Sequence, residues 1–109
     1  MATLPEKTVH DLKAMMDDGT SFVLLDVREP DEYDICNLGG QLLPLRQLPF
    51  RVQELQEYKE ALVVVHCRSG GRSAQAAEFL QSQGFSDVYN LKGGILAWSA
   101  EIDPSMPTY

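Results

Sequence analysis

The sequence predicts an α/β domain in which helices cover both faces of a parallel β-sheet. Short apolar runs at residues 22–27, 62–66 and 87–91 are typical of strands that are buried on both sides. Stretches with the apolar spacing of helices lie between these runs, and strands that alternate with helices form parallel sheets with right-handed crossovers. The chain has 109 residues, 44% of them hydrophobic, which suffices for one domain with its own core.

The first part of the chain predicts a helix on each side of the strand at residues 22–27. Thr8, followed by Asp11, is a typical N-cap of a helix with one apolar face, and Gly19 ends that helix. A proline opens residues 30–35, as expected at the first position of a short helix.

Three further elements are predicted around the strand at residues 62–66. Residues 41–43 form a brief strand that Pro44 ends, and residues 50–57 have the spacing of an amphipathic helix. Residues 73–83 form the clearest helix of the chain, because their apolar residues share one face, and the glycine at position 84 ends it.

The last segment predicts a short helix after the turn at residues 93–94, with Trp98 in the core. Two prolines in residues 102–109 then favour a loose tail. We therefore expect a single domain over residues 1–109, with its core at about residues 4–101.

Composition argues against two classes of partner. The net charge is −7, so the surface repels a phosphate backbone, and we expect no nucleic-acid partner. No apolar run approaches the roughly 18–20 residues that span a bilayer, so we expect no membrane partner. The N-terminus lacks the basic start and apolar stretch of a secretory signal, which makes the cytoplasm the expected location.

Acidic residues cluster in the first third of the chain. We interpret them as a solvated helix face, and a docking surface for a basic partner is the alternative. The cluster comprises Asp26, Glu29, Asp31, Glu32 and Asp34.

The chain has two cysteines, Cys36 and Cys67, and two histidines, His10 and His66. Two cysteines in a domain of this size do not make a disulfide scaffold. Neither histidine stands at ligand spacing from a cysteine pair. The sequence therefore predicts no metal site and no cofactor.

Residues 67–72 (C-R-S-G-G-R) place a cysteine between a strand and a helix. Gly70 and Gly71 can adopt positive φ, which lets successive amides point inward as an anion-binding nest. The helix from about Ser73 directs its positive end at the same point, and two arginines of the loop add charge. These effects favour the thiolate and should hold the pKa of Cys67 below the free value of about 8.5. A buried structural cysteine before an ordinary turn is the weaker alternative.

The spacing of the loop narrows the chemistry. Cysteine phosphatases use C-x5-R, a ring wide enough for phosphate, whereas Cys67 and Arg72 are spaced C-x4-R. One residue fewer removes up to about 3.5 Å of chain. The smaller ring should hold one extra sulfur atom, so we expect Cys67 to cycle between thiolate and persulfide.

Three segments together resemble the rhodanese family of sulfurtransferases: residues 24–33 (LLDVREPDEY), residues 63–85 with the cysteine loop, and residues 88–98 (VYNLKGGILAW). The resemblance implies a single domain with a five-stranded parallel sheet and Cys67 as the persulfide carrier. It implies a small anionic donor such as thiosulfate or a protein persulfide, and cyanide or a thiol as acceptor. The implied substrate cradle consists of Arg68, Ser69, Gly70, Gly71 and Arg72.

One segment departs from the family pattern. Where the family usually has G-H-I-P-G-A, residues 36–41 have C-N-L-G-G-Q, and the stretch up to residues 43–45 is one residue shorter. We expect an altered turn there with activity retained. The variant resembles the rhodanese domains that are fused to adenylyltransferases of thiamine and molybdenum-cofactor biosynthesis.

Several other residues have structural interpretations. By resemblance, Asp26 and Arg28 brace neighbouring loops through hydrogen bonds, and Ser73 supports the cysteine loop. Cys36 fits a small apolar filler, with a resolving thiol as the alternative. His66 should point away from Cys67, because neighbouring strand residues face opposite sides, and we expect a histidine with satisfied hydrogen bonds.

Two other functions remain open on the sequence. A small cysteine-based phosphatase or arsenate reductase uses a related loop, and the shorter ring counts against it. A non-catalytic interaction module is the third possibility, because a fold does not guarantee activity. Retention of Cys67 with both loop arginines counts against that possibility.

Overall fold

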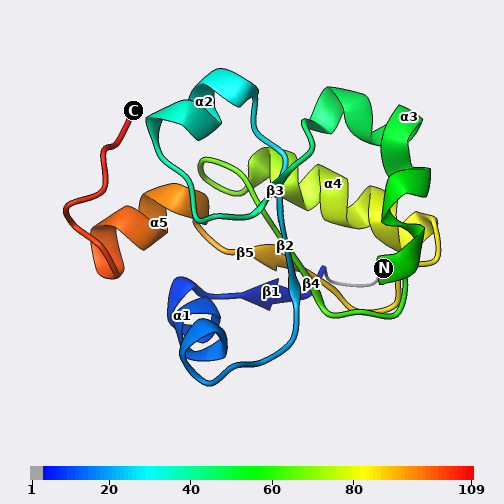
Figure 1. The fold of residues 1–109 in the computed structure, drawn as a ribbon, viewed down its shortest axis with the longest axis horizontal. Coiled ribbons are helices and arrows are strands. Elements are labelled where there is room, and N and C mark those ends of the chain that lie inside the picture. The colour runs from blue at the N-terminus through cyan, green and yellow to red at the C-terminus, as the bar shows by residue number, and fades with distance from the viewer. Residues whose placement is uncertain (1–3) are drawn as a thin grey trace.

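A computed structural model describes residues 4–109, and within them the chain forms a five-stranded parallel sheet with the strand order β1-β5-β4-β2-β3. Figure 1 shows helices on both sides of this sheet, which confirms the predicted fold class. The strands are β1 (Glu6–Lys7), β2 (Val23–Asp26), β3 (Gln41–Leu42), β4 (Val63–His66) and β5 (Val88–Leu91).

The helices divide between the two faces of the sheet. On one face α1 contacts α5, and on the other α4 packs against β4 and β5 (Figure 1). Two 3₁₀ helices, η1 (Leu45–Gln47) and η2 (Val52–Tyr58), flank the short helix α3. The α-helices are α1 (Val9–Asp17), α2 (Pro30–Ile35), α3 (Leu48–Arg51), α4 (Gly71–Ser82) and α5 (Gly94–Glu101).

The alternation of side chains along the central strand β4 explains why the side chain of Cys67 lies on the α4 side of the sheet. All four residues of β4 are buried, and its three valines alternate between two hydrophobic clusters. Val64 belongs to the cluster under α1 and α5, whereas Val63, Val65 and Cys67 belong to the cluster under α4. The alternation continues through His66, so its side chain and that of Cys67 lie on opposite sides of the sheet.

Two elements differ from the sequence prediction. The strand β1 pairs in parallel with β5 and was missed by the apolar pattern, because it has two residues and both are charged. The amphipathic helix expected at residues 50–57 is divided into α3 and η2, because Arg51 leaves helical geometry with φ −121° and ψ 7°.

Residues 102–109 contact the body of the domain, which differs from the loose tail that we expected. The amide of Ile102 donates to the oxygen of Trp98, and Met106 packs against the cluster under α1 and α5. Ser99 Oγ donates to the oxygen of Met106 at 3.3 Å. The end of the segment lies beside α2, where the C mark stands in Figure 1.

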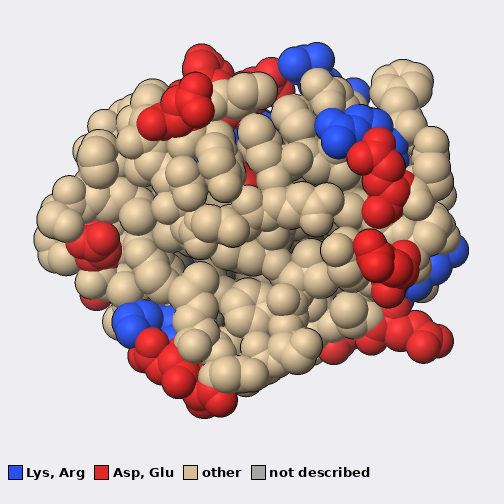
Figure 2. All heavy atoms as spheres, viewed as in Figure 1, with Lys and Arg blue, Asp and Glu red and all other residues tan. Residues whose placement is uncertain are grey.

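The surface matches the negative net charge. Acidic side chains lie in several separate groups around the rim of the face seen in Figure 2, and its centre carries neither sign. Within residues 4–109 no helix combines the length and the apolar composition that crossing a membrane requires.

Candidate active site

The cysteine loop turns from β4 into α4 through a single left-handed residue. Gly70 is the N-cap of α4 and has φ +116°, a conformation that side chains disfavour. Gly71 is already helical, so the expectation of positive φ at both glycines is wrong for Gly71. A β-carbon on Gly71 would meet no atom of residues 4–109 within 4 Å. Only Gly70 needs to be glycine for the turn.

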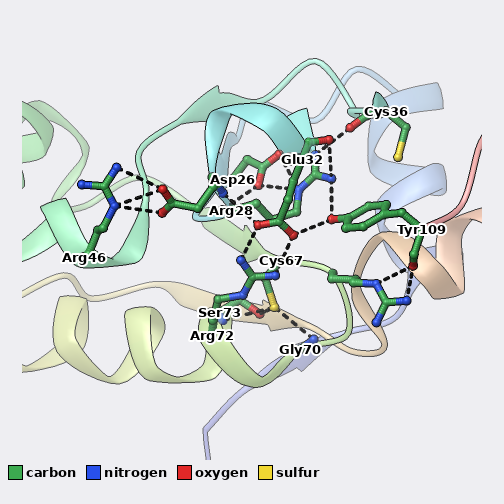
Figure 3. Close-up of polar contacts among 12 residues, drawn as sticks. Asp26, Arg28, Glu32, Cys36, Arg46, Cys67, Gly70, Arg72, Ser73 and Tyr109 are labelled. Atoms are coloured by element: carbon green, nitrogen blue, oxygen red, sulfur yellow. Dashed lines mark hydrogen bonds and ion pairs between the residues drawn. The ribbon is translucent and has the colours of Figure 1, made fainter. Parts of the chain in front are cut away.

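Three hydrogen-bond donors converge on the sulfur of Cys67. The Gly70 amide lies 3.1 Å from Sγ, and the amide and hydroxyl of Ser73 each lie 3.4 Å from it (Figure 3). The cysteine residue is 1% exposed. Its sulfur therefore faces the donors of the loop and the first turn of α4, whereas Ser69 and Gly71 of the same loop are exposed.

Burial is the largest single influence on the pKa of Cys67 and raises it. The hydrogen bonds from the Ser73 hydroxyl and amide, followed by those from the Gly70 and Ser69 amides, together outweigh burial. The net result is a pKa below the usual value of a thiol, in the direction that the sequence predicted. A lowered pKa enriches the thiolate, which is the nucleophilic form.

Asn90 of β5 holds the donor side of the site together, and the sequence analysis missed it. Ser73 Oγ lies 2.5 Å from Asn90 Oδ1, and Asn90 Nδ2 donates to the Gly70 oxygen at 3.3 Å. The Ser73 hydroxyl has one proton, so Asn90 and Cys67 are alternative acceptors for it. A polar residue inside the apolar run at residues 87–91 was the available signal.

The loop carbonyls point away from the sulfur, toward α5. The Ile95 amide donates to the Cys67 oxygen and the Leu96 amide to the Arg68 oxygen, each at 3.0 Å. A β-carbon on Gly94 would lie 2.5 Å from the Arg68 oxygen and 2.7 Å from the Cys67 oxygen. The close approach of α5 therefore requires glycine at position 94, and it leaves the loop amides free to face Sγ.

Arg72 is paired with a carboxylate of α2. Its Nη1 and Nη2 donate to Glu32 Oε1 and Oε2 at 2.6 and 2.8 Å (Figure 3). Hydrogen bonding to Arg72 is the main reason that the pKa of Glu32 falls to about 2. The charge that Arg72 was expected to bring to the loop is thus matched by Glu32.

The acidic cluster is only partly the solvated face that we predicted. Asp31 and Asp34 are exposed, whereas Asp26 is fully buried and Glu32 is partly buried in the pair with Arg72. The solvated interpretation is therefore wrong for Asp26 and Glu32. The position of Asp26 at the end of a strand was the signal that could have separated it from the rest.

Asp26 and Arg28 form a fully buried ion pair behind the site. Arg28 Nη2 lies 2.7 Å from Asp26 Oδ2, and Nε lies 2.9 Å from Oδ1. The same guanidinium donates to the backbone oxygens of Cys36 at 2.8 Å and Glu32 at 3.3 Å. These contacts join the end of β2 to the first turn and to the C-terminal end of α2. The positioning role that the family resemblance implies for Asp26 and Arg28 stays a prediction.

Tyr109 also reaches the site, and no motif in the sequence indicated this. Its hydroxyl lies 2.8 Å from Glu32 Oε2 and accepts from Arg28 Nη1 at 2.9 Å. The backbone oxygen of Tyr109 accepts hydrogen bonds from Nε and Nη2 of Arg68. Two of the three arginines at this edge of the sheet are thus bonded to Tyr109.

Cys36 and His66 lie outside the group of residues that are hydrogen-bonded to the sulfur of Cys67. Cys36 is buried at the end of α2, and Figure 3 shows it on the far side of Arg28 from Cys67. His66 is fully buried, and neither ring nitrogen has a hydrogen-bond partner among residues 4–109, so the expected satisfied histidine is wrong. Its Nε2 lies 3.6 Å from Asp26 Oδ2, and burial lowers its pKa.

Metal ligation receives no support from the described part of the chain, residues 4–109. No group of three or more His, Cys, Asp and Glu side chains there is placed to hold a metal ion. The polar groups that converge at the strand ends are instead hydrogen-bond donors around one sulfur atom.

The fold and site define a class: an α/β domain that presents a single cysteine, surrounded by loop amides, at the carboxyl edge of a parallel sheet. The family model described as a Rhodanese-like domain matches residues 8–101. The chain therefore belongs to the rhodanese-like family, as its three motifs indicated.

Similar proteins place the domain in different contexts. A sulfurtransferase of Allochromatium vinosum is 38% identical over 83% of this chain and 83% of its own length. The Rhodanese-like/PpiC domain-containing protein 12, chloroplastic, of Arabidopsis thaliana is 50% identical over 79% of the chain, and the probable adenylyltransferase/sulfurtransferase MoeZ of Mycobacterium tuberculosis is 35% identical over 94%. The matches span only 30% and 26% of those two proteins.

Solved structures agree with the fold. A rhodanese-like domain protein from Staphylococcus aureus superposes with a TM-score of 0.78 and 25% identity, covering 97% of this chain and 99% of that one. A thiosulfate sulfurtransferase from Pseudomonas aeruginosa gives a TM-score of 0.78 with 30% identity, over 89% of this chain and 19% of that one.

Proposed function

We propose that this chain transfers sulfane sulfur through a persulfide on Cys67. The observation that carries the proposal is the convergence of the Gly70 amide and the Ser73 amide and hydroxyl on Sγ. Such donors stabilise an anionic sulfur and can equally stabilise the terminal sulfur of a persulfide. The names of several relatives, which include sulfurtransferase and sulfur carrier protein, support this chemistry.

The donor half-reaction is a displacement at sulfur. The thiolate of Cys67 attacks the outer sulfur of thiosulfate, a new S–S bond forms, and the original S–S bond breaks. Sulfite leaves with the electron pair of the broken bond. Because sulfite is a weak base, the step needs no general acid.

The acceptor half-reaction returns the enzyme to its starting state. Cyanide or a thiolate attacks the terminal sulfur of the persulfide and forms a bond to it. The S–S bond of the persulfide breaks, and Cys67 leaves as the thiolate that its hydrogen bonds stabilise. Protein persulfide donors and protein acceptors fit the same two steps, and the sulfur carrier protein YrkF of Bacillus subtilis is one relative whose name supports such partners.

The loop supplies the proposed cradle. Arg68, Ser69, Gly70, Gly71 and Arg72 surround the position of the terminal sulfur. Ser73, Asp26 and Arg28 act as positioning residues that hold this loop and its neighbours. The cytoplasmic location and the single-domain boundaries expected from the sequence stay predictions.

Intact-mass measurement tests the proposal directly. Incubation of the purified protein with thiosulfate should add the mass of one sulfur atom, and cyanide should remove it with formation of thiocyanate. Cys67→Ala should abolish the gain, whereas Cys36→Ala, the matched control, should keep it. Sulfur carried on Cys36, or release of phosphate from an aryl phosphate without any sulfur transfer, would overturn the proposal.

A further inference from the structure

Tyr109 closes the arginine side of the cysteine loop through two separate groups. Its hydroxyl is bonded to Glu32 and Arg28, and its backbone oxygen to Arg68. The guanidinium of Arg68 also lies over the tyrosine ring, 5.2 Å from its centroid. Figure 3 shows the phenol hydroxyl directed at Glu32 and Arg28.

Arg68 differs from Arg28 and Arg72 in the group to which its guanidinium is bonded. Arg28 and Arg72 are each paired with a carboxylate, Asp26 and Glu32 respectively. Within residues 4–109 Arg68 makes no ion pair with an Asp or Glu side chain, and its guanidinium donates to the main-chain oxygen of Tyr109. Arg68 is therefore the guanidinium of this site that is most readily available to an anion, once that oxygen moves away.

The segment before Tyr109 is held in place, which gives the contact a defined geometry. Asp103 Oδ1 accepts from the Ser105 amide at 3.2 Å and from its hydroxyl at 2.5 Å. The Met106 amide donates to the Asp103 oxygen at 3.1 Å, and its own oxygen is held by Ser99. Only residues 107–109 separate this anchored turn from the site.

We propose that Tyr109 is a specificity-determining residue that discriminates against small free anions at the Cys67 site. With Tyr109 in place, its oxygen occupies the donor groups of Arg68 that a small anionic sulfur donor would use. Such a donor binds only by displacing Tyr109. Because the hydrogen bonds of Tyr109 must then break, the binding free energy of the donor becomes less favourable. The identity of the donor in this inference rests on the proposed function. The effect of Tyr109 on the access of anions does not depend on it.

Alkylation of Cys67 measures anion access without any sulfur transfer. In a Cys36→Ala background, the rate of reaction with iodoacetate, an anion, is compared with that of the neutral iodoacetamide. Tyr109→Ala keeps the main-chain oxygen and removes the ring and the hydroxyl that hold it against Arg68. The iodoacetate rate should therefore rise about tenfold, the size expected from losing one net hydrogen bond to a charged group. The iodoacetamide rate should rise much less, so the ratio of the two rates increases.

Matched variants distinguish discrimination against anions from a general loosening of the structure around Cys67. Tyr109→Phe keeps the ring and removes the bonds to Glu32 and Arg28, and it should give an intermediate ratio even if Tyr109→Ala folds poorly. Tyr58→Phe, on the distant η2, should leave both rates unchanged. In an Arg68→Ala background, removal of the Tyr109 side chain should no longer change the ratio.

The sulfur-transfer assay then extends the inference to the donor. In Tyr109→Ala the KM for thiosulfate should fall with little change in kcat. An unchanged ratio of alkylation rates in both Tyr109 variants, or an equal rise for both reagents, would overturn the inference. Absence of sulfur transfer with a changed alkylation ratio would overturn the proposed function alone.

Discussion

Replacing Glu32 by glutamine tests whether the Arg72 pair holds the cysteine loop to α2. The amide keeps the shape of the side chain and removes the charge that faces the guanidinium. In the structure both carboxylate oxygens are bonded to Arg72, at 2.6 and 2.8 Å, and Oε2 also accepts from Tyr109. Glutamine can replace only one of these acceptors, so the variant should be less stable.

The size of the effect follows from the pKa of Glu32. That pKa is lowered from 4.5 to about 2, chiefly by hydrogen bonding to Arg72. At about 1.36 kcal/mol per pKa unit, linkage sets an upper limit of about 3.4 kcal/mol on the contribution to folding. The Arg72 side chain is 35% exposed, so solvent screens the pair, and we expect roughly 1.5 to 2 kcal/mol at neutral pH.

The pH dependence has a definite sign. Because the folded-state pKa lies below the unfolded value, the stabilisation is fully present above pH 4.5 and is lost as the pH falls toward 2. Urea unfolding at neutral pH and at about pH 3 should show the difference between wild type and Glu32→Gln shrinking to less than half at the lower pH.

A surface pair provides the control for this experiment. Glu54 makes two similar bonds to Arg51, at 2.9 and 3.0 Å, on an exposed part of η2. Glu54→Gln should leave the free energy of unfolding unchanged within error, because exposed pairs contribute little. Equal stability of wild type and Glu32→Gln, or a difference that stays the same at both pH values, would refute the reasoning.

Three further substitutions have defined outcomes. Ser73→Ala removes the largest of the contributions that lower the pKa of Cys67, so that pKa should rise and alkylation by iodoacetamide near neutral pH should slow; an unchanged pH–rate profile would contradict this. Gly94→Ala brings a β-carbon 2.5 Å from a loop carbonyl and should cost about 1–3 kcal/mol in urea unfolding, whereas Gly71→Ala, with nothing within 4 Å, should cost far less; equal costs would count against it. Asp26→Asn leaves a buried guanidinium uncompensated and should lower stability by about 3–5 kcal/mol, a loss that thermal unfolding would reveal or exclude.

The parts of the fold that depend on local pattern could be predicted from the sequence. The buried strands and α4 have apolar spacing that differs clearly from their surroundings. The strand β1 could not be predicted from pattern, because two charged residues at a sheet edge form a strand only through their pairing with β5. The break between α3 and η2 depends on one backbone conformation at Arg51, which apolar spacing does not encode.

The candidate site divides in the same way. The donors to Cys67 lie within six residues of it along the chain, so a local motif indicated them. The partners of the loop arginines are far away in sequence: Glu32 is 40 residues from Arg72, and Tyr109 is 41 residues from Arg68. Contacts over such separations depend on how the whole chain packs, and no local pattern carried them.

The attachment of the loop carbonyls to α5 limits how this domain can be remodelled. The loop is fixed at one end by β4 and at the other by α4, and the carbonyls of its first two residues, Cys67 and Arg68, are held by the Ile95 and Leu96 amides. A residue inserted between Cys67 and Arg68 would push at least one of these carbonyls out of reach of α5 and leave a polar group without its partner. A longer loop that accommodates a bulkier oxyanion can therefore keep both bonds to α5 only if the added residue lies after Arg68.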